Sequence, residues 1–512
     1  MHICARLETF RLDLPTIHPS WVSPAGWIVC EELSKSLKDL DKVPSDGSRT
    51  SPRIELRLRS AAPSALDVGE GAALVSSPAA EPMTLGDKRR LCVLPLLLLL
   101  LLIFYGPGQP PPLAPWGAVE PPGSLGAGGG GGVGGDDVDC EASVSDGEAW
   151  PPPELLASVR RSGQAERLLV AWTRDCSAFR RARRYADAPL SHEEAAFPIA
   201  YSVIVHHRVD MLERLLRAVY APQNFYCLHV DAKSPRAYLE AVRALAACFP
   251  NVFVARRLEV VVYASWSRVQ ADLNCMRELV ERAGERPWRY FINLCGLDFP
   301  IKTNLEIVRA LGGLHGANSV ESTRPSRFKA ARWRTRHAVV WNRVFDLRLA
   351  KAPPPIATPV FAGGAYVAVT RAFVEHVLSD PAARAFAEWS KDTYSPDEHL
   401  WATLQRMPGV PGATPVDQKY DVTDVQALTH LVRWQSMEGD VLQGAAYPPC
   451  RGVHVRGICI NAAGDVPWVL RQPQLFVNKV DASLDQGAAV RCLERSLRRR
   501  ELAQTQRRGA TE

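Results

Sequence analysis

The segment Ala200-Tyr201-Ser202-Val203-Ile204-Val205-His206 decides the fold class of this chain. Its apolar run with a polar end is typical of a strand buried on both faces. A second apolar run, 225–230, ends at Asp231. Between the two runs, apolar residues recur at helical spacing at Met211, Leu212, Leu215, Leu216 and Val219. This alternation predicts a parallel α/β sheet, because parallel strands are joined by crossover helices.

The same alternation continues along the chain. We expect a helix up to about residue 248, a strand over 251–254, a helix over 268–280 and a strand over 290–294. Ligands of such sheets bind beyond the carboxyl ends of the strands, which points to His206, Asp231 and the turn from Cys295 to Asp298. Neither a Gly-x-Gly-x-x-Gly motif nor a P-loop motif accompanies these strands, so a dinucleotide site and a P-loop are both excluded.

The N-terminal part has a different composition. The apolar run 91–105 follows the basic residues Lys88, Arg89 and Arg90 and predicts a signal-anchor, although a full span takes roughly 20 residues. A cleaved signal peptide is the alternative. Residues 1–90 would be a cytoplasmic tail, unless translation starts at Met83 and 1–82 are absent. The Pro/Gly-rich residues 106–153 predict a flexible stem, and 154–512 a lumenal folded domain.

Charge and cysteine content restrict the class of protein further. A net charge of +6 over 512 residues is mild and does not indicate a nucleic-acid partner. Nine of the twelve cysteines follow the apolar run, and none forms a Cys-x-x-Cys pair. This pattern favours structural disulfides in an oxidising compartment over a zinc site. Because nine is odd, at least one thiol is free or pairs between chains, as in a homodimer.

Several stretches beyond the stem are similar to one family, the core 2 β-1,6-N-acetylglucosaminyltransferases. They are 197–202 (FPIAYS), 220–224 (YAPQN), 262–269 (VYASWSRV), 392–398 (DTYSPDE), 432–435 (VRWQ), 438–440 (EGD) and 462–465 (AAGD). The resemblance extends from about Arg174 to Leu497. It implies a GT-A-like α/β fold with a mixed, mostly parallel sheet, and a type II protein of the Golgi membrane whose catalytic domain is lumenal.

The resemblance also implies an activity. The family transfers GlcNAc from UDP-GlcNAc, with inversion and without a metal cofactor, in β-1,6 linkage to the GalNAc of core 1 glycans (Gal-β1,3-GalNAc-Ser/Thr) on mucin-type glycoproteins. A broader enzyme that also makes core 4 and I branches is one alternative, and a catalytically silent, lumenal sugar-binding relative is another. A distant xylosyl-type transferase is disfavoured by the match around Trp266 and Glu398.

The resemblance makes Glu398 the catalytic base, which would take the proton of the acceptor hydroxyl. The residues alone favour a different interpretation. Ser395-Pro396-Asp397-Glu398, just before Leu400 and Trp401, has the pattern of a helix-capping box with proline at the first helical position.

Many nucleotide-sugar transferases hold a metal with an Asp-x-Asp pair, and residues 154–512 contain none. The pairs Asp39-Leu40-Asp41 and Asp137-Val138-Asp139 precede that domain. The resemblance assigns the diphosphate to the cations Arg456 and Lys479 instead, which can stabilise the same charge. It places Ile204, His206, Asp231 and Tyr263 at the donor and Glu321, Lys329, Arg332 and Trp434 at the acceptor.

Local interpretations compete with these assignments. Core packing would equally explain Ile204, Tyr263 and Trp434, and a solvated basic loop would explain Lys329 and Arg332. Core 2-selective members carry tyrosine two residues after the tryptophan, whereas this chain has Ser436, so the resemblance does not imply strict core 2 selectivity and the wider acceptor range is the nearest alternative. By resemblance the disulfides are Cys140–Cys492, Cys176–Cys248, Cys227–Cys275 and Cys450–Cys459, which leaves Cys295 free beside the active site.

Overall fold

The computed structural model describes residues 164–284, 287–415 and 427–509. The expected cytoplasmic tail, signal-anchor and stem, and Cys140, lie outside these ranges. Across the described residues, no helix combines the length and the apolar character that a membrane span needs. The expected topology therefore stays a prediction.

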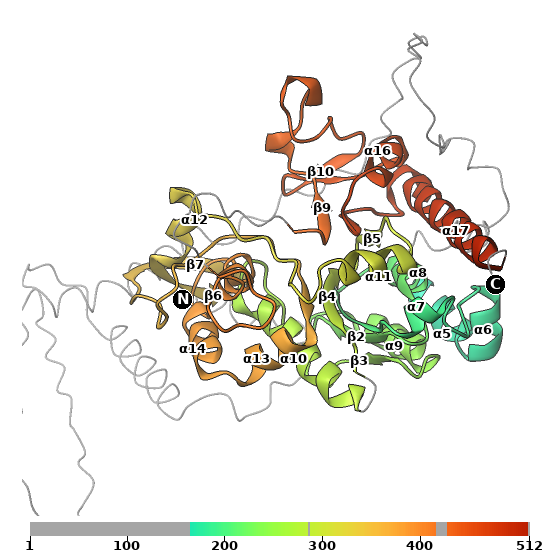
Figure 1. The fold of residues 1–512 in the computed structure, drawn as a ribbon, viewed down its shortest axis with the longest axis horizontal. Coiled ribbons are helices and arrows are strands. Elements are labelled where there is room, and N and C mark those ends of the chain that lie inside the picture. The colour runs from blue at the N-terminus through green and yellow to red at the C-terminus, as the bar shows by residue number, and fades with distance from the viewer. Residues whose placement is uncertain (1–163, 285–286, 416–426, 510–512) are drawn as a thin grey trace, which may run out of the picture. The chain divides into compact units, whose positions relative to one another are not determined.

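A five-stranded sheet in the order β3-β2-β1-β4-β8 forms the centre of the described domain (Figure 1). β1 to β4 are parallel, and β8 is antiparallel to β4. The strands are β1 (Ile199–Val205), β2 (Phe225–Val230), β3 (Val252–Val254), β4 (Tyr290–Cys295) and β8 (Ala368–Thr370). The expected mixed, mostly parallel sheet is confirmed.

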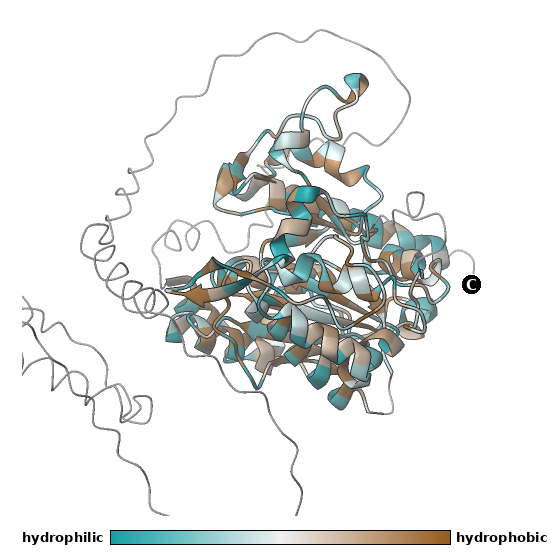
Figure 2. Cartoon of the chain, turned by 90° about the vertical axis from the view of Figure 1, so that its left-hand side faces the viewer, coloured by the Kyte–Doolittle hydropathy of each residue, from teal (hydrophilic) through white to brown (hydrophobic). Residues whose placement is uncertain are grey.

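Helices cover both faces of this sheet, because successive strand residues point to opposite sides. Tyr201 and Val203 of β1 belong to one apolar cluster, whereas Ala200 belongs to the other. The first face packs against α5 (Gln164–Trp172), α8 (Val209–Val219), α9 (Arg236–Ala247) and α11 (Asn304–Gly312). The second packs against α10 (Trp266–Ala283), α13 (Arg371–Ser379), α14 (Pro381–Ser390) and α15 (Leu400–Leu404). Peripheral helices accordingly alternate hydrophilic and hydrophobic segments in Figure 2.

A smaller sheet lies beyond the carboxyl end of β4. Its three strands are β5 (Asp298–Pro300), β12 (Phe476–Asn478) and β9 (His430–Val432), with β12 in the middle. Apolar side chains of α16 (Val466–Leu470) and α17 (Ala488–Gly509) share a core with it. Two separate hairpins complete the strands: β6 (Thr335–Val340) with β7 (Arg343–Ala350), and β10 (Val453–Val455) with β11 (Ile458–Ile460).

The remaining helical elements are short. The α-helices are α6 (Cys176–Ala182), α7 (His192–Ala195) and α12 (Arg327–Ala330). The 3-10 helices are η4 (Ala331–Trp333), η5 (Pro396–Glu398), η6 (Gln435–Met437), η7 (Val441–Gln443), η8 (Ala463–Asp465) and η9 (Leu484–Gly487). Several of them carry residues expected in the site, so the site is built largely from segments between regular elements.

Three of the expected disulfides are formed. Cys176–Cys248 joins the start of α6 to the end of α9, Cys227–Cys275 joins β2 to α10, and Cys450–Cys459 encloses the β10–β11 hairpin. Cys492 is also disulfide-bonded, and its expected partner Cys140 is outside the described residues. Within the described residues Cys295 is a free cysteine, as expected.

Candidate functional site

The strand order reverses between β1 and β4, because the chain proceeds from β1 to β2 and β3 on one side and to β4 on the other. Open α/β sheets bind ligands at the carboxyl ends of the strands at such a point. His206 directly follows β1, and Cys295 ends β4. Ile204 pairs in register with Cys295 and is 7% exposed, so its expected place next to the site and the core-packing alternative both fit.

Three of the expected donor-site residues, His206, Asp231 and Lys479, interact electrostatically. The pKa of His206 is lowered to about 4, first by partial burial of the imidazole ring and then by the neighbouring His207. Part of the residue is nevertheless exposed at the surface. Asp231 opposes this shift and Lys479 adds to it. Asp231 is also bonded to Lys233, whose Nζ lies 2.8 Å from Oδ2. The sequence interpretation missed Lys233, although Asp231-Ala232-Lys233 at a strand end was a usable signal.

A buried polar network anchors the strand that precedes Lys479. The Asn478 amide donates to Oδ1 of Asp298 and, at 3.0 Å, to the Tyr366 hydroxyl. Oδ2 of Asp298 accepts the backbone N–H of Cys295 at 2.6 Å and lies 3.2 Å from Nε2 of His430. Burial, followed by Asp298, raises the pKa of the Cys295 thiol to about 11, so this cysteine is held as a thiol at neutral pH.

Glu398 ends η5, and the capping-box interpretation of this segment is wrong. Ser395 has a left-handed backbone with φ of 46°, and its side chain caps nothing. Its N–H donates to the carbonyl of Ala264 instead of to a glutamate side chain. The Glu398 carboxylate is directed elsewhere: Oε2 lies 2.5 Å from Nη1 of Arg332. Proline does occupy the first helical position, as expected.

Gly363 fixes the position of the Glu398 backbone. Its N–H donates to the Glu398 carbonyl at 2.8 Å. A Cβ atom added at Gly363 would lie 1.9 Å from the carbonyl oxygen of Glu321, so only glycine fits there. The expected base and the expected acceptor residue Glu321 are therefore held against the same short segment.

Tyr263 connects Glu398 to Arg456. The Arg456 guanidinium carbon lies 4.3 Å from the centroid of the Tyr263 ring, a cation–π contact. Partial burial, followed by Tyr394 and Glu398, raises the pKa of Tyr263, whereas Arg456 lowers it. Because Tyr263 is 61% exposed, the core-packing alternative is wrong for this residue.

The other expected acceptor residues lie around this group. Trp434 is 41% exposed, so the core-packing alternative is wrong for this residue. Its ring lies 4.0 Å from the position that a Cβ atom would take on Gly457, the residue that follows Arg456 in the chain. Partial burial, followed by Glu321, raises the pKa of Tyr447, a residue that precedes the Cys450–Cys459 loop. Lys329 lies on α12, one short helix before Arg332. The ion pair with Glu398 contradicts the solvated-loop alternative for Arg332.

The two expected diphosphate-binding cations contact different groups. Arg456 is at the tip of the β10–β11 hairpin and lies over Tyr263. The Lys479 carbonyl accepts the N–H of Asn461 just after β11, and its ammonium acts on His206 and Cys295. Adjacent segments thus carry both cations, with Arg456 against the Tyr263 ring and Lys479 at the β1–β4 edge.

Sequence reasoning missed two residues of this neighbourhood. Tyr394 lies between Arg332 and Tyr263: its N–H donates to the Arg332 carbonyl, and its ring is 5.7 Å from the guanidinium. Burial, followed by Glu398, raises the pKa of Asp397 to about 6. Its Oδ1 is buried without a hydrogen-bond partner. Both residues belong to the quoted stretch 392–398, but their neighbours are distant in sequence.

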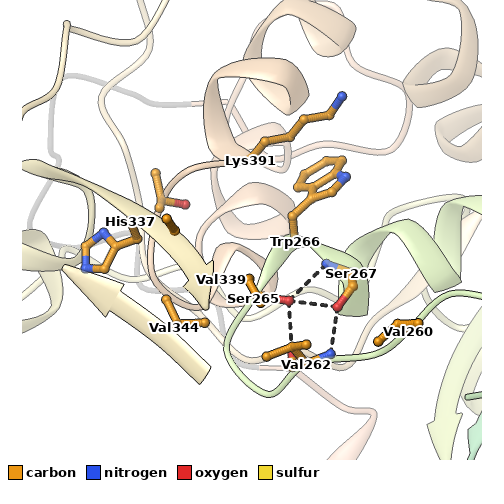
Figure 3. A pocket seen from close by; sticks show the side chains of 11 residues that line it. Val260, Val262, Ser265, Trp266, Ser267, His337, Val339, Val344 and Lys391 are labelled. Carbon is orange, nitrogen blue, oxygen red and sulfur yellow. Dashed lines mark hydrogen bonds between the residues drawn. The ribbon is translucent and has the colours of Figure 1, made fainter. Parts of the chain in front are cut away.

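An apolar cavity of about 310 Å³ lies close by but contains none of the expected site residues (Figure 3). It is lined by Ser265, Trp266 and Ser267 at the start of α10, by Val260 and Val262, by Lys391 and Thr393, and by His337, Ala338, Val339 and Val344 of the β6–β7 hairpin.

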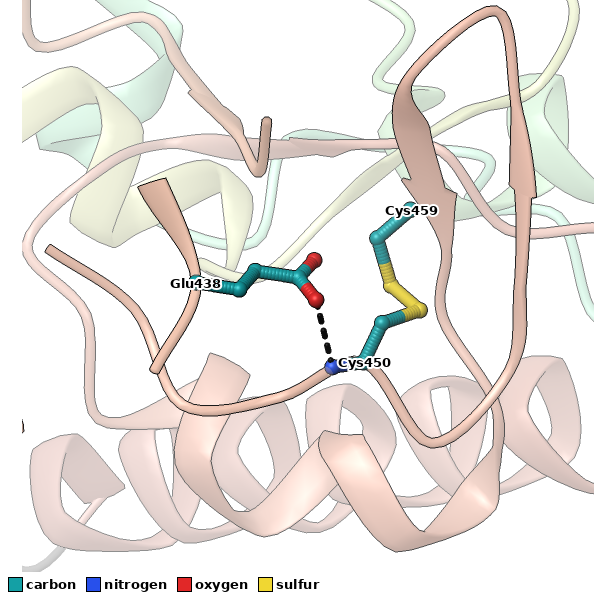
Figure 4. Close-up of side chains that lie close together, drawn as sticks. All are labelled: Glu438, Cys450 and Cys459. Atoms are coloured by element: carbon teal, nitrogen blue, oxygen red, sulfur yellow. Dashed lines mark hydrogen bonds between the residues drawn. A yellow bond between two sulfur atoms is a disulfide. The ribbon is translucent and has the colours of Figure 1, made fainter. Parts of the chain in front are cut away.

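Glu438, Cys450 and Cys459 form the one group among the described residues whose spacing would suit a metal ion (Figure 4). Both cysteines are joined in a disulfide, so neither supplies a thiolate ligand. One Glu438 oxygen accepts the N–H of Cys450 at 3.0 Å, and the other lies 3.0 Å from Nε2 of His454. This group is therefore structural.

Comparison with known proteins gives a consistent answer. The Core-2/I-Branching enzyme family model matches residues 199–469. A Homo sapiens protein named β-1,3-galactosyl-O-glycosyl-glycoprotein β-1,6-N-acetylglucosaminyltransferase is 55% identical over 333 residues, which are 65% of this chain and 77% of that protein. A second human protein of this name, numbered 3, is 51% identical over 64% of this chain and 74% of its own length. A protein of bovine herpesvirus 4 (strain DN-599) with the same name is 53% identical over 65% of this chain and 75% of its own length. The chain therefore belongs to the core-2/I-branching enzyme family of glycosyltransferases.

Proposed function

We propose that this chain transfers GlcNAc from UDP-GlcNAc in β-1,6 linkage to the GalNAc of Gal-β1,3-GalNAc-Ser/Thr and so forms core 2 branches. The names of its relatives support this linkage and an O-glycosylated glycoprotein acceptor. The observation that carries the proposal is the convergence of Glu398, Arg332, Tyr263 and Arg456 in one group near the carboxyl edge of the sheet.

In the proposed reaction, Glu398 acts as the base. Its carboxylate takes the proton of the GalNAc 6-hydroxyl while that oxygen attacks the anomeric carbon of GlcNAc. The bond from that carbon to the diphosphate breaks, the electron pair leaves with UDP, and the configuration inverts. The Arg332 ion pair orients the carboxylate before the acceptor arrives. Glu321, Lys329 and Trp434 would bind the acceptor sugars by hydrogen bonds and by an apolar indole face.

Arg456 and Lys479 would replace a divalent metal in this reaction. Charge develops on the departing diphosphate, and preorganised cations stabilise it. The lack of an Asp-x-Asp pair in residues 154–512 supports the metal-free proposal. His206, Asp231 and Ile204 would contact the nucleotide part of the donor at the β1–β4 edge. The place proposed for this enzyme is the Golgi membrane, with the catalytic domain in the lumen.

The test is an assay of the purified full-length chain with UDP-GlcNAc, in EDTA, on free core 1 and core 3 glycosides. We expect transfer to core 1 that EDTA does not reduce, and product analysis should show the β-1,6 linkage. If the chain transferred GlcNAc to neither acceptor, the proposed transferase activity would be refuted. If added Mn²⁺ restored activity lost in EDTA, the role proposed for Arg456 and Lys479 would be refuted.

A wider acceptor range is the second candidate function. Ser436 is exposed, two residues after the exposed Trp434, so the wall beside the indole is smaller than a tyrosine would make it. Transfer to core 3 glycosides, which yields core 4 branches, or to poly-lactosamine, which yields I branches, would support this candidate in the same assay.

A further inference from the structure

The β6–β7 hairpin exposes an unusual amount of apolar surface. Trp341 at its turn is 88% exposed and Phe328, just before it, is 79% exposed. Strand side chains that are also exposed are Val339, Val340, Phe345, Leu347 and Leu349. Large apolar side chains exposed together on one element often mark an interaction site.

The same segment is strongly basic. Residues 322–352 contain nine Lys and Arg residues against one acidic residue, Asp346. Some are neutralised: Arg336 and Lys351 both bond Asp392, and Arg348 lies 3.4 Å from Asp346. Arg327, Arg334 and Arg343 are exposed and form no ion pair with another described residue. The hairpin therefore combines exposed aromatic side chains with uncompensated positive charge.

The apolar cavity lies under this hairpin. In Figure 3 Val339 and Val344 of the hairpin approach Val262 and Ser265, with Trp266 and Lys391 on the adjoining wall. Ser265 and Ser267 bond each other and the backbone of Val262, so their hydroxyls are satisfied. The lining is consequently suited to an apolar side chain rather than to a sugar, whose hydroxyls would need partners.

The hairpin is continuous with the candidate active site. The N–H of His337 donates to the Asp392 carbonyl, and the Arg332 carbonyl accepts the N–H of Tyr394. Segment 392–394 thus bonds both the hairpin and the helix before it, and it leads directly to Glu398. An acceptor polypeptide whose sugar reached Glu398 would therefore lie next to the β6–β7 hairpin.

Three kinds of partner could cover an apolar, basic surface: a second copy of this chain, a membrane or an acidic polypeptide. A second copy that docks symmetrically would place like charges against each other, which destabilises the contact. A polypeptide fits a further property: β7 pairs only with β6 among the described strands, so its outer edge can bond an extended chain, whereas the outer edge of β6 already bonds segment 392–394 at His337.

We propose that the β6–β7 hairpin and its cavity bind the polypeptide of acidic acceptor glycoproteins, outside the sugar-binding centre. The inference rests on the proposed function and specifies its substrate class. Acidic residues of the acceptor would pair with Arg334 and Arg343, and an apolar residue would fill the cavity that Val339 and Val344 line. The exposed Trp341 at the turn would add apolar contact with the polypeptide. Such contacts lower the KM for glycoproteins and leave the chemistry at the sugar unaffected.

The test compares three acceptors with the full-length chain: a free core 1 glycoside and two glycopeptides of equal length that carry the same disaccharide, one flanked by Asp and Leu and one by Lys and Ser. We expect the wild-type KM to be about tenfold lower for the acidic glycopeptide, as two or three exposed ion pairs allow. Arg334→Glu with Arg343→Glu should abolish that preference, and Trp341→Ala should raise the acidic glycopeptide's KM about threefold.

Activity on the free glycoside serves as the folding control, and Arg243→Glu is the matched control. Arg243 is an exposed arginine of α9, on the other face of the sheet from α10, and its variant should retain the preference. Equal KM values of the wild type for both glycopeptides would overturn the inference. A second result would also overturn it. In that result the wild type binds phosphatidylserine vesicles or forms a dimer, and the double variant loses this property although its KM values for the glycopeptides stay unchanged. No transfer to the glycoside by the wild type would instead refute the proposed function.

Discussion

Arg332 and Glu398 form an ion pair across 66 residues of chain, with Nη1 2.5 Å from Oε2. The pair is partly buried, since the two side chains are 19% and 27% exposed. Tyr394 supports it, because its N–H donates to the Arg332 carbonyl and its ring lies beside the guanidinium. A cation expected to bind the acceptor thus orients the carboxylate that is expected to deprotonate it, which links acceptor binding to catalysis.

Glu398→Gln should lower kcat by about 10²- to 10⁴-fold, because the amide cannot accept the proton of the acceptor hydroxyl. UDP binding, measured by calorimetry, should remain. Ser395→Ala is a suitable control, since the Ser395 side chain caps nothing, and its activity should stay near that of the wild type. Full turnover by the glutamine variant would remove Glu398 from the mechanism.

Arg456→Ala should reduce kcat/KM by about 10²-fold or more, because the departing diphosphate loses a preorganised cation. Tyr263→Phe keeps the aromatic face under the guanidinium and should cost much less than Tyr263→Ala. Initial rates at several UDP-GlcNAc concentrations test both points. If Arg456→Ala regained activity with Mn²⁺, or lost none, the assignment of this arginine would be wrong.

Ser436→Tyr should narrow the acceptor range. A phenol ring beside the exposed Trp434 would fill space that Ser436 leaves open, and so would favour core 1 over core 3 acceptors. The measurement is the ratio of kcat/KM values for the two glycosides, which should rise by about tenfold, the effect of one to two kcal/mol of differential binding. Ser436→Thr, a smaller change at the same position, should leave the ratio close to that of the wild type.

Asp397→Asn should stabilise the protein at neutral pH. The folded-state pKa of about 6 lies above the unfolded value near 3.9, so the contribution of Asp397 to folding is fully present below about pH 4 and is lost as the pH rises through 6. Asparagine avoids that loss. In thermal unfolding, the free-energy gain of the asparagine variant over the wild type should be roughly 2 to 3 kcal/mol larger at pH 7.5 than at pH 4. If the variant and the wild type differed in unfolding free energy by the same amount at both pH values, the raised pKa of Asp397 would be wrong.

Local patterns were enough to predict the four parallel strands of the sheet. The apolar runs ending at His206 and Asp231, with a helix between them, became β1, α8 and β2 within one or two residues. The reason is that burial on both faces of a parallel strand requires a continuous apolar run, which is visible without any partner. The resemblance added the pairing Cys227–Cys275, which the spacing of cysteines does not determine.

Tertiary structure decided how the site residues are used. Ser395 to Glu398 has the pattern of a capping box, yet Ser395 donates its N–H to Ala264 and Glu398 bonds Arg332. Both partners come from segments far away in the chain, so no local pattern contains them. The sequence by itself therefore determined the four parallel strands, the helices between them and the family, but not the antiparallel strand β8. Only the folded chain, through loops whose paths depend on packing against that sheet, decided that Glu398 faces a cation rather than capping a helix.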